Sequence, residues 1–180
     1  MSFNSNLQKQ LPNHVAFIMD GNRRWARKKK LKIIDGHKKG SEIVKNIVKK
    51  SLEFDIKYLT FFSFSTENWS RSKDEILNLQ TLLSFYLDSE EEHFIKKKIK
   101  FSFIGEIDKF EDKIKSKLKN LQVLTSSFNK LHFTLALSYG SRREIVNSIK
   151  KINKKLSLLT EVCQNYQISF LLQIHLPKLP

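Results

Sequence analysis

Cysteine is nearly absent from this 180-residue chain, in which Cys163 is the only one. A single cysteine excludes an internal disulfide and a zinc site built from cysteines alone, and this usage fits a reducing cytosol. Long apolar runs are absent too: nowhere do about 18 apolar residues follow one another, and the amino-terminal segment lacks the basic and apolar regions of a signal peptide. We therefore expect a soluble, cytoplasmic protein.

Acidic residues are scarce relative to basic ones, because 18 Asp and Glu stand against 33 Lys and Arg, for a net charge of +15. Such an excess favours phosphates, anionic lipid head groups or nucleic acid as partners. Lysine runs such as 28–30 and 96–98, however, are typical of solvated helix faces. No base-reading motif accompanies the charge, so we expect no nucleic-acid partner.

The chain also lacks internal repeats and low-complexity linkers, and its length suits one domain spanning residues 1–180. Hydrophobic residues make up 40% of it and include 14 Phe, enough for a core of ordinary size. Periodicity predicts strands at 15–19, 58–64, 100–105 and 131–139, and helices from 22 onward and at 36–55, 73–99, 110–124 and 141–156. This alternation indicates an α/β fold with a mostly parallel sheet.

The first predicted strand runs from Val15 to Met19, an apolar segment of the kind that is buried on both faces of a parallel sheet. Directly after it come Asp20, Gly21, Asn22 and two arginines, Arg23 and Arg24. Glycine permits close backbone approach, a helix start offers free N–H groups, and arginines suit phosphate oxygens. The segment fits a diphosphate with Mg²⁺ held by Asp20. Alternatively, Asp20 caps the next helix and the arginines are solvated.

A second predicted strand, 58–64, also ends in a polar cluster, the segment from Ser65 to Arg71. Ligands of open parallel sheets bind outside the carboxyl ends of the strands. Both clusters are therefore expected to face one crevice.

Four segments occur in one order along the chain: HVAFIMDGNRRWA, GHKKG, FSFSTENWSR and ALSYGSRREI. In sequence and order they resemble the signature motifs of the cis-prenyltransferase family, the isoprenyl transferases of the undecaprenyl diphosphate synthase type. The resemblance runs from about His14 to about Ile145, and the first and third motifs are specific to that family. It implies a single α/β domain, with an open, mostly parallel sheet flanked by helices that enclose a hydrophobic tunnel.

The resemblance implies a transferase that condenses isopentenyl diphosphate with an allylic diphosphate, such as farnesyl diphosphate, and adds cis isoprene units. It further implies Mg²⁺ as the cofactor, a homodimer, and peripheral membrane contact for the lipid product, which would be undecaprenyl diphosphate for a cell-wall lipid carrier. Diphosphate is a poor leaving group until its charge is neutralised. The metal and fixed hydrogen-bond donors that neutralise this charge are therefore the main source of catalysis.

Matched residue by residue, the motifs assign catalytic roles to Asp20, the metal-binding aspartate, and to Asn68, the family's proposed catalytic asparagine. The substrate-binding residues they assign are Gly21, Asn22, Arg23, Arg24, Trp25, His37, Ser65, Thr66, Glu67, Trp69 and Arg71. Several of these residues also have a simpler interpretation. Both tryptophans could be packing residues, and Arg71 could form an ion pair with Glu75. His37 could be a surface histidine.

The predicted helix between Ile76 and Phe94 carries apolar residues on more than one face. Such a helix is either buried more than usual or packed against a partner. The resemblance offers another interpretation, a wall of the hydrophobic tunnel. The candidates for this wall are Phe61, Leu79, Leu83, Phe85, Leu87 and Leu135.

The chain departs from the family pattern in two motifs. Ile33, next to Lys32, stands where the family often has an arginine, which weakens a cationic contact. The usual Asn-Tyr-Gly-Gly-Arg reads Ser138-Tyr139-Gly140-Ser141-Arg142, and we expect this change to alter the turn geometry.

The ending Leu176–Pro180 resembles the segment that precedes a further family motif, whose two arginines hold isopentenyl diphosphate. We therefore expect a carboxyl-terminal truncation, an unpaired sheet edge and poor catalysis. The alternative function is a catalytically impaired homologue that binds diphosphate or a partner subunit without turnover.

Overall fold

The computed structural model describes residues 11–165. Its elements, in chain order, are β1 (His14–Ile18), α2 (Asn22–Lys28), α3 (Ile33–Glu53), β2 (Tyr58–Ser65), the 3-10 helix η1 (Thr66–Ser70), α4 (Lys73–Lys96), β3 (Ile99–Ile104), α5 (Asp112–Leu124), β4 (Leu131–Tyr139) and α6 (Ser141–Asn165). The predicted α/β fold is confirmed. Helix α3 begins three residues earlier than its periodicity indicated, and α6 extends further.

The four strands form one parallel sheet in the order β1-β2-β4-β3. Phe17 of β1 lies opposite Phe61 of β2, and Phe61 lies opposite Leu135 of β4. Because all strands run the same way, their carboxyl ends meet at one edge of the sheet. The Met19 amide donates to the Phe62 carbonyl at 3.0 Å, which ties the tips of β1 and β2 together.

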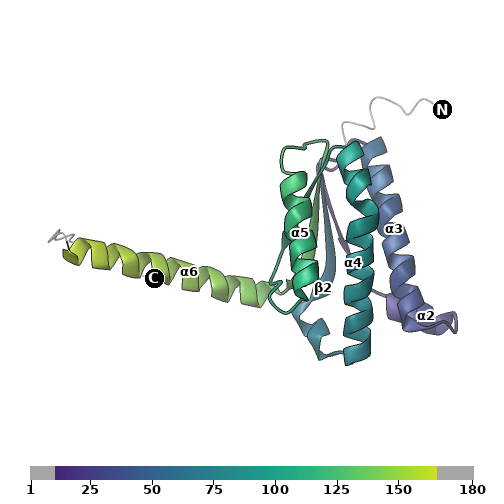
Figure 1. Ribbon diagram of the computed structural model, residues 1–180, viewed down its shortest axis with the longest axis horizontal. Helices are drawn as coiled ribbons and strands as arrows, with labels where there is room; N and C mark the ends of the chain where they lie inside the picture. Colours follow the sequence, from purple (N-terminus) through teal and green to yellow (C-terminus); the bar gives the residue numbers. More distant parts are fainter. Residues whose placement is uncertain (1–10, 166–180) are drawn as a thin grey trace, which may run out of the picture. The chain divides into compact units, whose positions relative to one another are not determined.

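Strand β1 differs from its prediction. Val15 and Phe17 face the core, but alternate residues are exposed and Ile18 is 78% exposed. Helices α3, α4 and α5 cover one face of the sheet (Figure 1), so among the described residues only the face of β1 that carries Val15 and Phe17 is packed against the core. The expectation of burial on both faces is wrong here.

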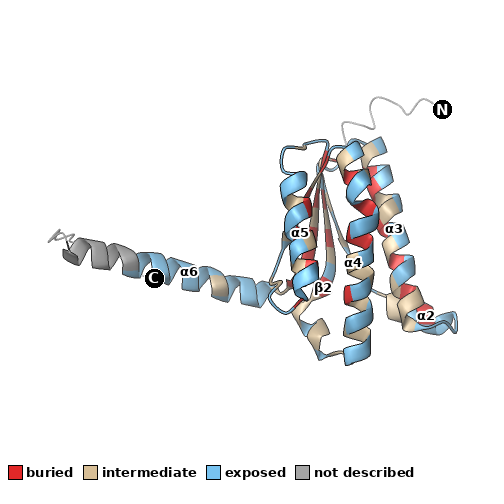
Figure 2. Cartoon of the chain, in the orientation of Figure 1, coloured by how far each residue is buried: buried red, intermediate tan, exposed pale blue. Residues whose placement is uncertain are grey.

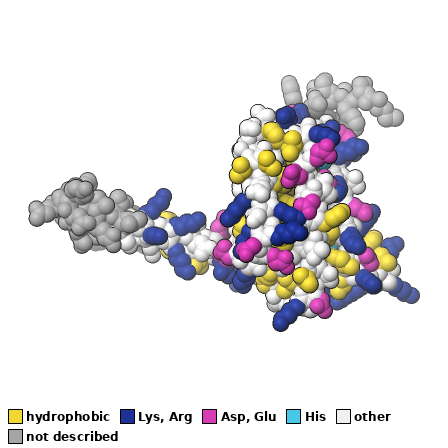
Figure 3. Space-filling model, viewed as in Figure 1, with side chains coloured by type: hydrophobic (Ala, Val, Ile, Leu, Met, Phe, Trp, Pro, Cys, Tyr) yellow, Lys and Arg dark blue, Asp and Glu magenta, His cyan; other side chains and the backbone are white. Residues whose placement is uncertain are grey.

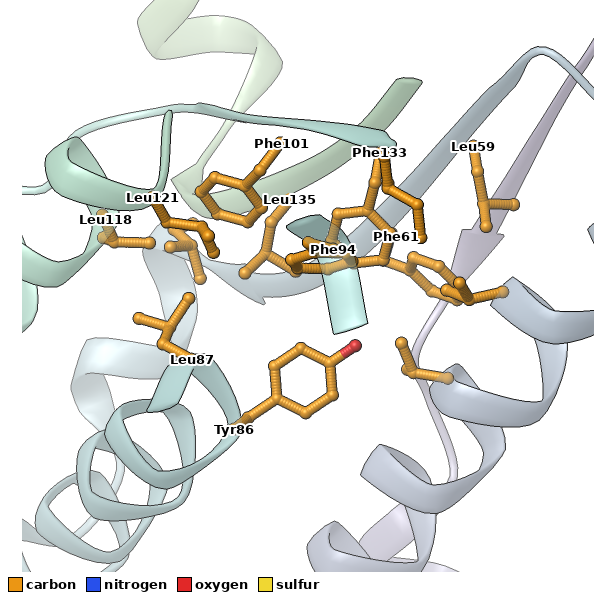
Figure 4. Packing of buried hydrophobic residues seen from close by; sticks show 14 of the residues in the cluster. Leu59, Phe61, Tyr86, Leu87, Phe94, Phe101, Leu118, Leu121, Phe133 and Leu135 are labelled. Carbon is orange, nitrogen blue, oxygen red and sulfur yellow. The ribbon is translucent and has the colours of Figure 1, made fainter. Parts of the chain in front are cut away.

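Helices α3, α4 and α5 lie side by side against one face of the sheet (Figure 1). Their buried residues line the sides that face the strands (Figure 2). Figure 4 shows the resulting core, in which Leu87 of α4 and Leu118 of α5 approach the phenyl rings of the sheet. Phe61, Phe94, Phe101 and Phe133 are completely buried, and these rings stack or tilt against one another at 5.3 to 6.0 Å. These phenylalanines therefore form a large part of the core between the sheet and the helices.

The chain divides after Gly140 into two compact units, Met1–Gly140 and Ser141–Pro180. In the second unit α6 repeats apolar residues at Ile145, Ile149, Ile152 and Leu156, a helical stripe. The segment Leu176–Pro180 lies outside the described residues. A single domain spanning 1–180 stays a prediction. None of the helices described between residues 11 and 165 is both long enough and apolar enough to span a bilayer.

Candidate anion-binding site beside an apolar cavity

The tip of β1 carries Asp20 and Gly21 at the sheet edge where the strands end. Gly21 has a φ of +86°, a left-handed conformation that favours glycine, and occupies the N-cap position of α2 without a side-chain cap. Asp20 is 76% exposed at its side chain and accepts a hydrogen bond from Arg24 Nη2 at 3.0 Å. Asp20 therefore does not cap α2, and its carboxylate faces solvent beside an arginine.

The two glycines of the GHKKG segment allow α3 to approach α2 closely. A Cβ on Gly36 would lie 2.2 Å from the Asn22 carbonyl oxygen, and one on Gly40 would lie 2.9 Å from the Asn22 side-chain amide. At Gly36 the obstacle is backbone, so no side chain fits there, whereas a side chain at Gly40 would require the Asn22 side chain to move. Gly36 therefore sets the contact between the helices. This contact brings His37, on α3, to the side of α2 that carries Arg23.

Three charged or titratable side chains converge on one carboxylate oxygen, Glu75 Oε1 at the start of α4. Arg71 Nη1 lies 3.0 Å from it, Arg23 Nε 3.6 Å and His37 Nε2 3.7 Å. The side chains of Glu75 and His37 are only 10% and 11% exposed. We call these four residues, Arg23, His37, Arg71 and Glu75, the Glu75 cluster. The proposed ion pair between Arg71 and Glu75 is confirmed, and the surface position of His37 is wrong.

The cluster has unused hydrogen-bonding capacity. Across the described part of the chain, Arg23 Nε and His37 Nε2 are buried with no hydrogen-bond partner. Burial lowers the pKa of His37, Arg71 and Arg23 lower it further, and Glu75 acts in the opposite direction. Buried polar atoms without partners are costly, and a bound water, ion or ligand would satisfy them.

The tip of β2 turns into η1. Asn68 Oδ1 accepts a hydrogen bond from the Ser65 amide at 3.1 Å, which fixes the side-chain amide at the start of this short helix. Ser65, Thr66 and Asn68 are half-buried and Glu67 is exposed. Thr66 lies against Gly140 at the end of β4, where a Cβ would meet Thr66 Oγ1 at 2.7 Å. The segment therefore packs on the tips of β2 and β4, as the parallel topology predicts.

Trp69 is a packing residue, which is one of the two roles that the sequence left open for it. Its ring contacts Phe64 and Phe110 edge-on, and its Nε1 donates to Ser138 Oγ at 2.9 Å. Ser138 stands where the family pattern has asparagine, and its φ of +49° is a conformation that asparagine adopts more readily than serine. Trp25, in contrast, is 39% exposed on α2. Whether either tryptophan also contacts substrate stays a prediction.

An apolar cavity of about 130 Å³ extends from the Glu75 cluster beneath α3 and α4. Asn22 and His37 line its polar end. Its wall is formed mainly by apolar side chains from the sheet and α4: Met19, Phe64, Leu79, Leu82, Leu83, Phe110, Phe133, Leu135 and Leu137. Tyr86 also lines it, and its buried hydroxyl has no hydrogen-bond partner among the described residues.

Only some of the residues predicted to form the tunnel wall line this cavity. Leu79, Leu83 and Leu135 line it. Phe61 and Leu87 are instead packed in the core, and Phe85 is 66% exposed on the outer side of α4. Successive residues of a helix point about 100° apart, so Phe85 turns outward when Tyr86 and Leu87 face the sheet. Phe85, one of the candidates for the wall, does not line this cavity.

A preformed metal cage is not found among residues 11–165, because no three His, Cys, Asp or Glu side chains gather there. Asp20 offers a single exposed carboxylate. That donor set fits Mg²⁺, which is commonly bound by one or two carboxylates together with phosphate oxygens and water.

Comparison with known proteins identifies the family of the chain. Residues 18–179 match the model of the undecaprenyl diphosphate synthase family. The chain belongs to this family, the cis-prenyltransferases. It is 38% identical over 177 residues to an isoprenyl transferase of Thermotoga maritima, covering 95% of this chain and 73% of that protein.

Two further family relatives extend the comparison. The chain is 36% identical to a farnesyl-diphosphate-specific ditrans,polycis-undecaprenyl-diphosphate synthase of Micrococcus luteus, with 93% of this chain and 69% of the relative covered. Lavandulyl diphosphate synthase of Lavandula x intermedia, solved with dimethylallyl diphosphate, matches with a TM-score of 0.78 at 32% identity, over 81% of this chain and 63% of that one. The chain thus spans roughly two thirds of the length of these cis-prenyltransferases.

The comparison leaves the role of Glu75 unexplained. From the sequence, Glu75 is considered only as a nearby acid with which Arg71 could pair. Arg23 and His37 come from two other helices. No local pattern would have placed them on the same oxygen.

Proposed function

We propose that this cis-prenyltransferase homologue binds the diphosphate of an allylic substrate at the strand tips and its hydrocarbon chain in the apolar cavity. The observation that carries this proposal is the position of His37, which belongs to the Glu75 cluster and also lines the cavity. Cationic donors thus adjoin an apolar space, the combination that an isoprenyl diphosphate requires. The dimethylallyl diphosphate in the lavandulyl diphosphate synthase structure supports the same substrate class.

The reaction that we propose is condensation of isopentenyl diphosphate with an allylic diphosphate such as farnesyl diphosphate, to give a cis-polyprenyl diphosphate. We assign undecaprenyl diphosphate, used as a cell-wall lipid carrier, as the product. A homodimer and peripheral membrane contact for the product belong to the same proposal.

Residues at the tips of β1 and β2 have different proposed roles in substrate binding. Arg24 and the backbone around Gly21 would hold phosphate oxygens, while Arg23, His37 and Arg71 supply further donors. Such preorganised donors stabilise negative charge as it develops on a departing diphosphate. Asn68, fixed by the Ser65 amide, would orient the reacting substrate, and Ser65, Thr66, Glu67, Trp69 and Trp25 would complete the substrate contacts.

Mg²⁺ is the cofactor that this chemistry implies, and Asp20 is the residue that would hold it. When bound, the metal neutralises diphosphate charge and so makes diphosphate a better leaving group. Asp20 accepts hydrogen bonds from the Gly21 amide at Oδ1 and from Arg24 at Oδ2, both at an exposed position. Metal binding would replace the contact with Arg24 at little cost, because exposed ion pairs contribute little stability.

The test is incorporation of labelled isopentenyl diphosphate into organic-soluble product, with farnesyl diphosphate and Mg²⁺ present. Because we expect this chain to be a poor catalyst, we expect weak incorporation by the unaltered chain and its loss in Asp20→Ala. Asp108→Ala, which removes an exposed carboxylate outside the site, is the matched control and should retain activity. Equal incorporation by Asp20→Ala and Asp108→Ala would refute the role of Asp20.

The alternative, a homologue that binds diphosphate without turnover, would give a different combination of results in binding and activity assays. Such a chain would bind inorganic pyrophosphate in the presence of Mg²⁺, with Asp20→Ala weakening the binding, but would incorporate no isopentenyl diphosphate. Absence of both binding and incorporation in a folded chain would reject the proposed site altogether.

A further inference from the structure

Glu75 is a negative charge inside a site whose other features attract anions. Two guanidinium groups and an imidazole lie within 4 Å of its Oε1 atom, and its side chain is only 10% exposed. A buried carboxylate in an anion site opposes anion binding by direct repulsion. Its presence there calls for a compensating role.

The cluster joins segments that are distant in the sequence. Arg23 comes from α2, His37 from α3, Arg71 from the residue after η1, and Glu75 from the first turn of α4. The Glu75 amide is itself held by the N-cap Ser72, whose Oγ accepts from it at 3.3 Å. Glu75 is thus anchored at a helix start, while the three groups it gathers come from neighbouring segments.

Without Glu75 the same groups would repel one another. Arg23 and Arg71 are both permanently charged, and like charges at short range destabilise a shared site. Each guanidinium has five N–H donors, so a contact with Glu75 occupies only a part of them. The remaining donors stay available to an anion.

We propose that Glu75 is a positioning residue that gathers Arg23, His37 and Arg71 into one anion-binding group. The inference rests on the proposed function, because the group it assembles is the one assigned to diphosphate. Glu75 acts through these side chains and need not touch the substrate.

A positioning role predicts a change in anion affinity that is opposite to the change expected from the charge of Glu75 alone. If Glu75 acted only through its charge, neutralising it would strengthen anion binding. If it positions the cluster, neutralising it loosens charge-assisted hydrogen bonds to the anion and weakens binding, by about tenfold or more for the loss of one such bond. The direction of the change therefore separates the two roles.

The experiment measures the affinity of the full chain for inorganic pyrophosphate with Mg²⁺ by calorimetry. The variant is Glu75→Gln, which keeps the shape and removes the charge. Asp74→Asn is the matched control, because it removes the same charge from the adjacent, exposed position in the same helix turn. We expect weaker binding in Glu75→Gln, and unchanged or slightly tighter binding in Asp74→Asn. Binding by Glu75→Gln that equals or exceeds that of the unaltered chain overturns the inference.

Two further measurements guard against a folding artefact. Glu75→Asp keeps the charge but shortens the side chain by one methylene, so it should also bind pyrophosphate more weakly, and equal binding would overturn the inference even if Glu75→Gln did not fold. In the NMR titration of His37, Glu75→Gln should lower the pKa of the imidazole further, because the nearby carboxylate raises it. An unchanged titration would place Glu75 away from His37 and also overturn the inference.

The outcomes also distinguish this inference from the proposed function. If the unaltered, folded chain binds no pyrophosphate, the proposed diphosphate site is rejected. If it binds pyrophosphate and Glu75→Gln binds equally well, only the positioning role of Glu75 is rejected.

Discussion

His37 shows how the function of a residue depends on its surroundings. A histidine in a lysine-rich segment is ordinarily a solvated surface group. Here the close contact between α2 and α3 buries it, and two arginines and one glutamate face it from three other segments. These surroundings favour the neutral imidazole at neutral pH.

We therefore predict that His37 makes the fold less stable in acid. Its pKa is below 6.5 in the folded chain, chiefly because of burial, and returns to the ordinary value on unfolding. The unfolded chain consequently binds the proton more readily, so this contribution to stability is present above the unfolded pKa and is lost as the pH falls through and below it. Denaturant unfolding at about pH 7.5 and about pH 5.5 measures the effect.

His37→Gln is the comparison that isolates this contribution from the other histidines. It should lose less stability than the unaltered chain between the two pH values. Identical losses in both proteins would show that the imidazole of His37 does not titrate as its surroundings require.

At the scale of elements, the approach of α3 to α2 decides the geometry of the site. The helices meet at Gly36 and Gly40, which face Asn22. Asn22 is also the residue that lines the polar end of the cavity together with His37. A small displacement of α3 would therefore move both the Glu75 cluster and the cavity entrance.

We predict that Gly36→Ala destabilises the chain. Its Cβ would lie 2.2 Å from the Asn22 carbonyl oxygen and 3.0 Å from Ala26 Cβ, so the backbone must shift. Overpacking of this kind costs about 1 to 3 kcal/mol, partly offset by the better helix propensity of alanine, which is worth about 1 kcal/mol. We expect a lower urea midpoint and weaker pyrophosphate binding.

The control for this prediction is Lys38→Ala, an exposed position in the same helix. Such surface changes usually alter stability by less than about 0.5 kcal/mol. A Gly36→Ala variant as stable as Lys38→Ala would mean that α2 and α3 can separate at no cost.

At the scale of the whole molecule, the chain carries a net charge of +15. On the face shown in Figure 3, Lys and Arg side chains are distributed among Asp and Glu and apolar side chains. Many of the lysines pair with a nearby carboxylate, as Lys39 does with Glu42 and Lys96 with Glu92. This distribution favours general attraction of anions over a dedicated nucleic-acid surface.

We predict that random duplex DNA binds only at low salt. A protein that makes about 6 to 10 phosphate contacts loses roughly 10³- to 10⁵-fold in affinity between about 50 and about 200 mM salt. Fluorescence anisotropy across this range should show a steep loss and no dependence on DNA sequence. Sequence-dependent binding that persists at the higher salt would instead support a nucleic-acid function.

The sequence by itself determined the α/β fold, the parallel sheet and the meeting of two motif-bearing strand tips. Each of these follows from local periodicity and from the direction of parallel strands. The short separation of Arg71 and Glu75 in the sequence was enough to consider their ion pair as an alternative role for Arg71. The order of the four motifs indicated the family.

Only the tertiary structure decided which side chains share an environment. It brought Arg23 and His37 to Glu75, joined Trp69 to Ser138, exposed one side of β1 and turned Phe85 away from the cavity. The physical reason is that these contacts join segments far apart in the chain. Their geometry depends on how closely two helices approach and on which face of the sheet the helices cover (Figure 1), and neither is encoded in the pattern of a single segment.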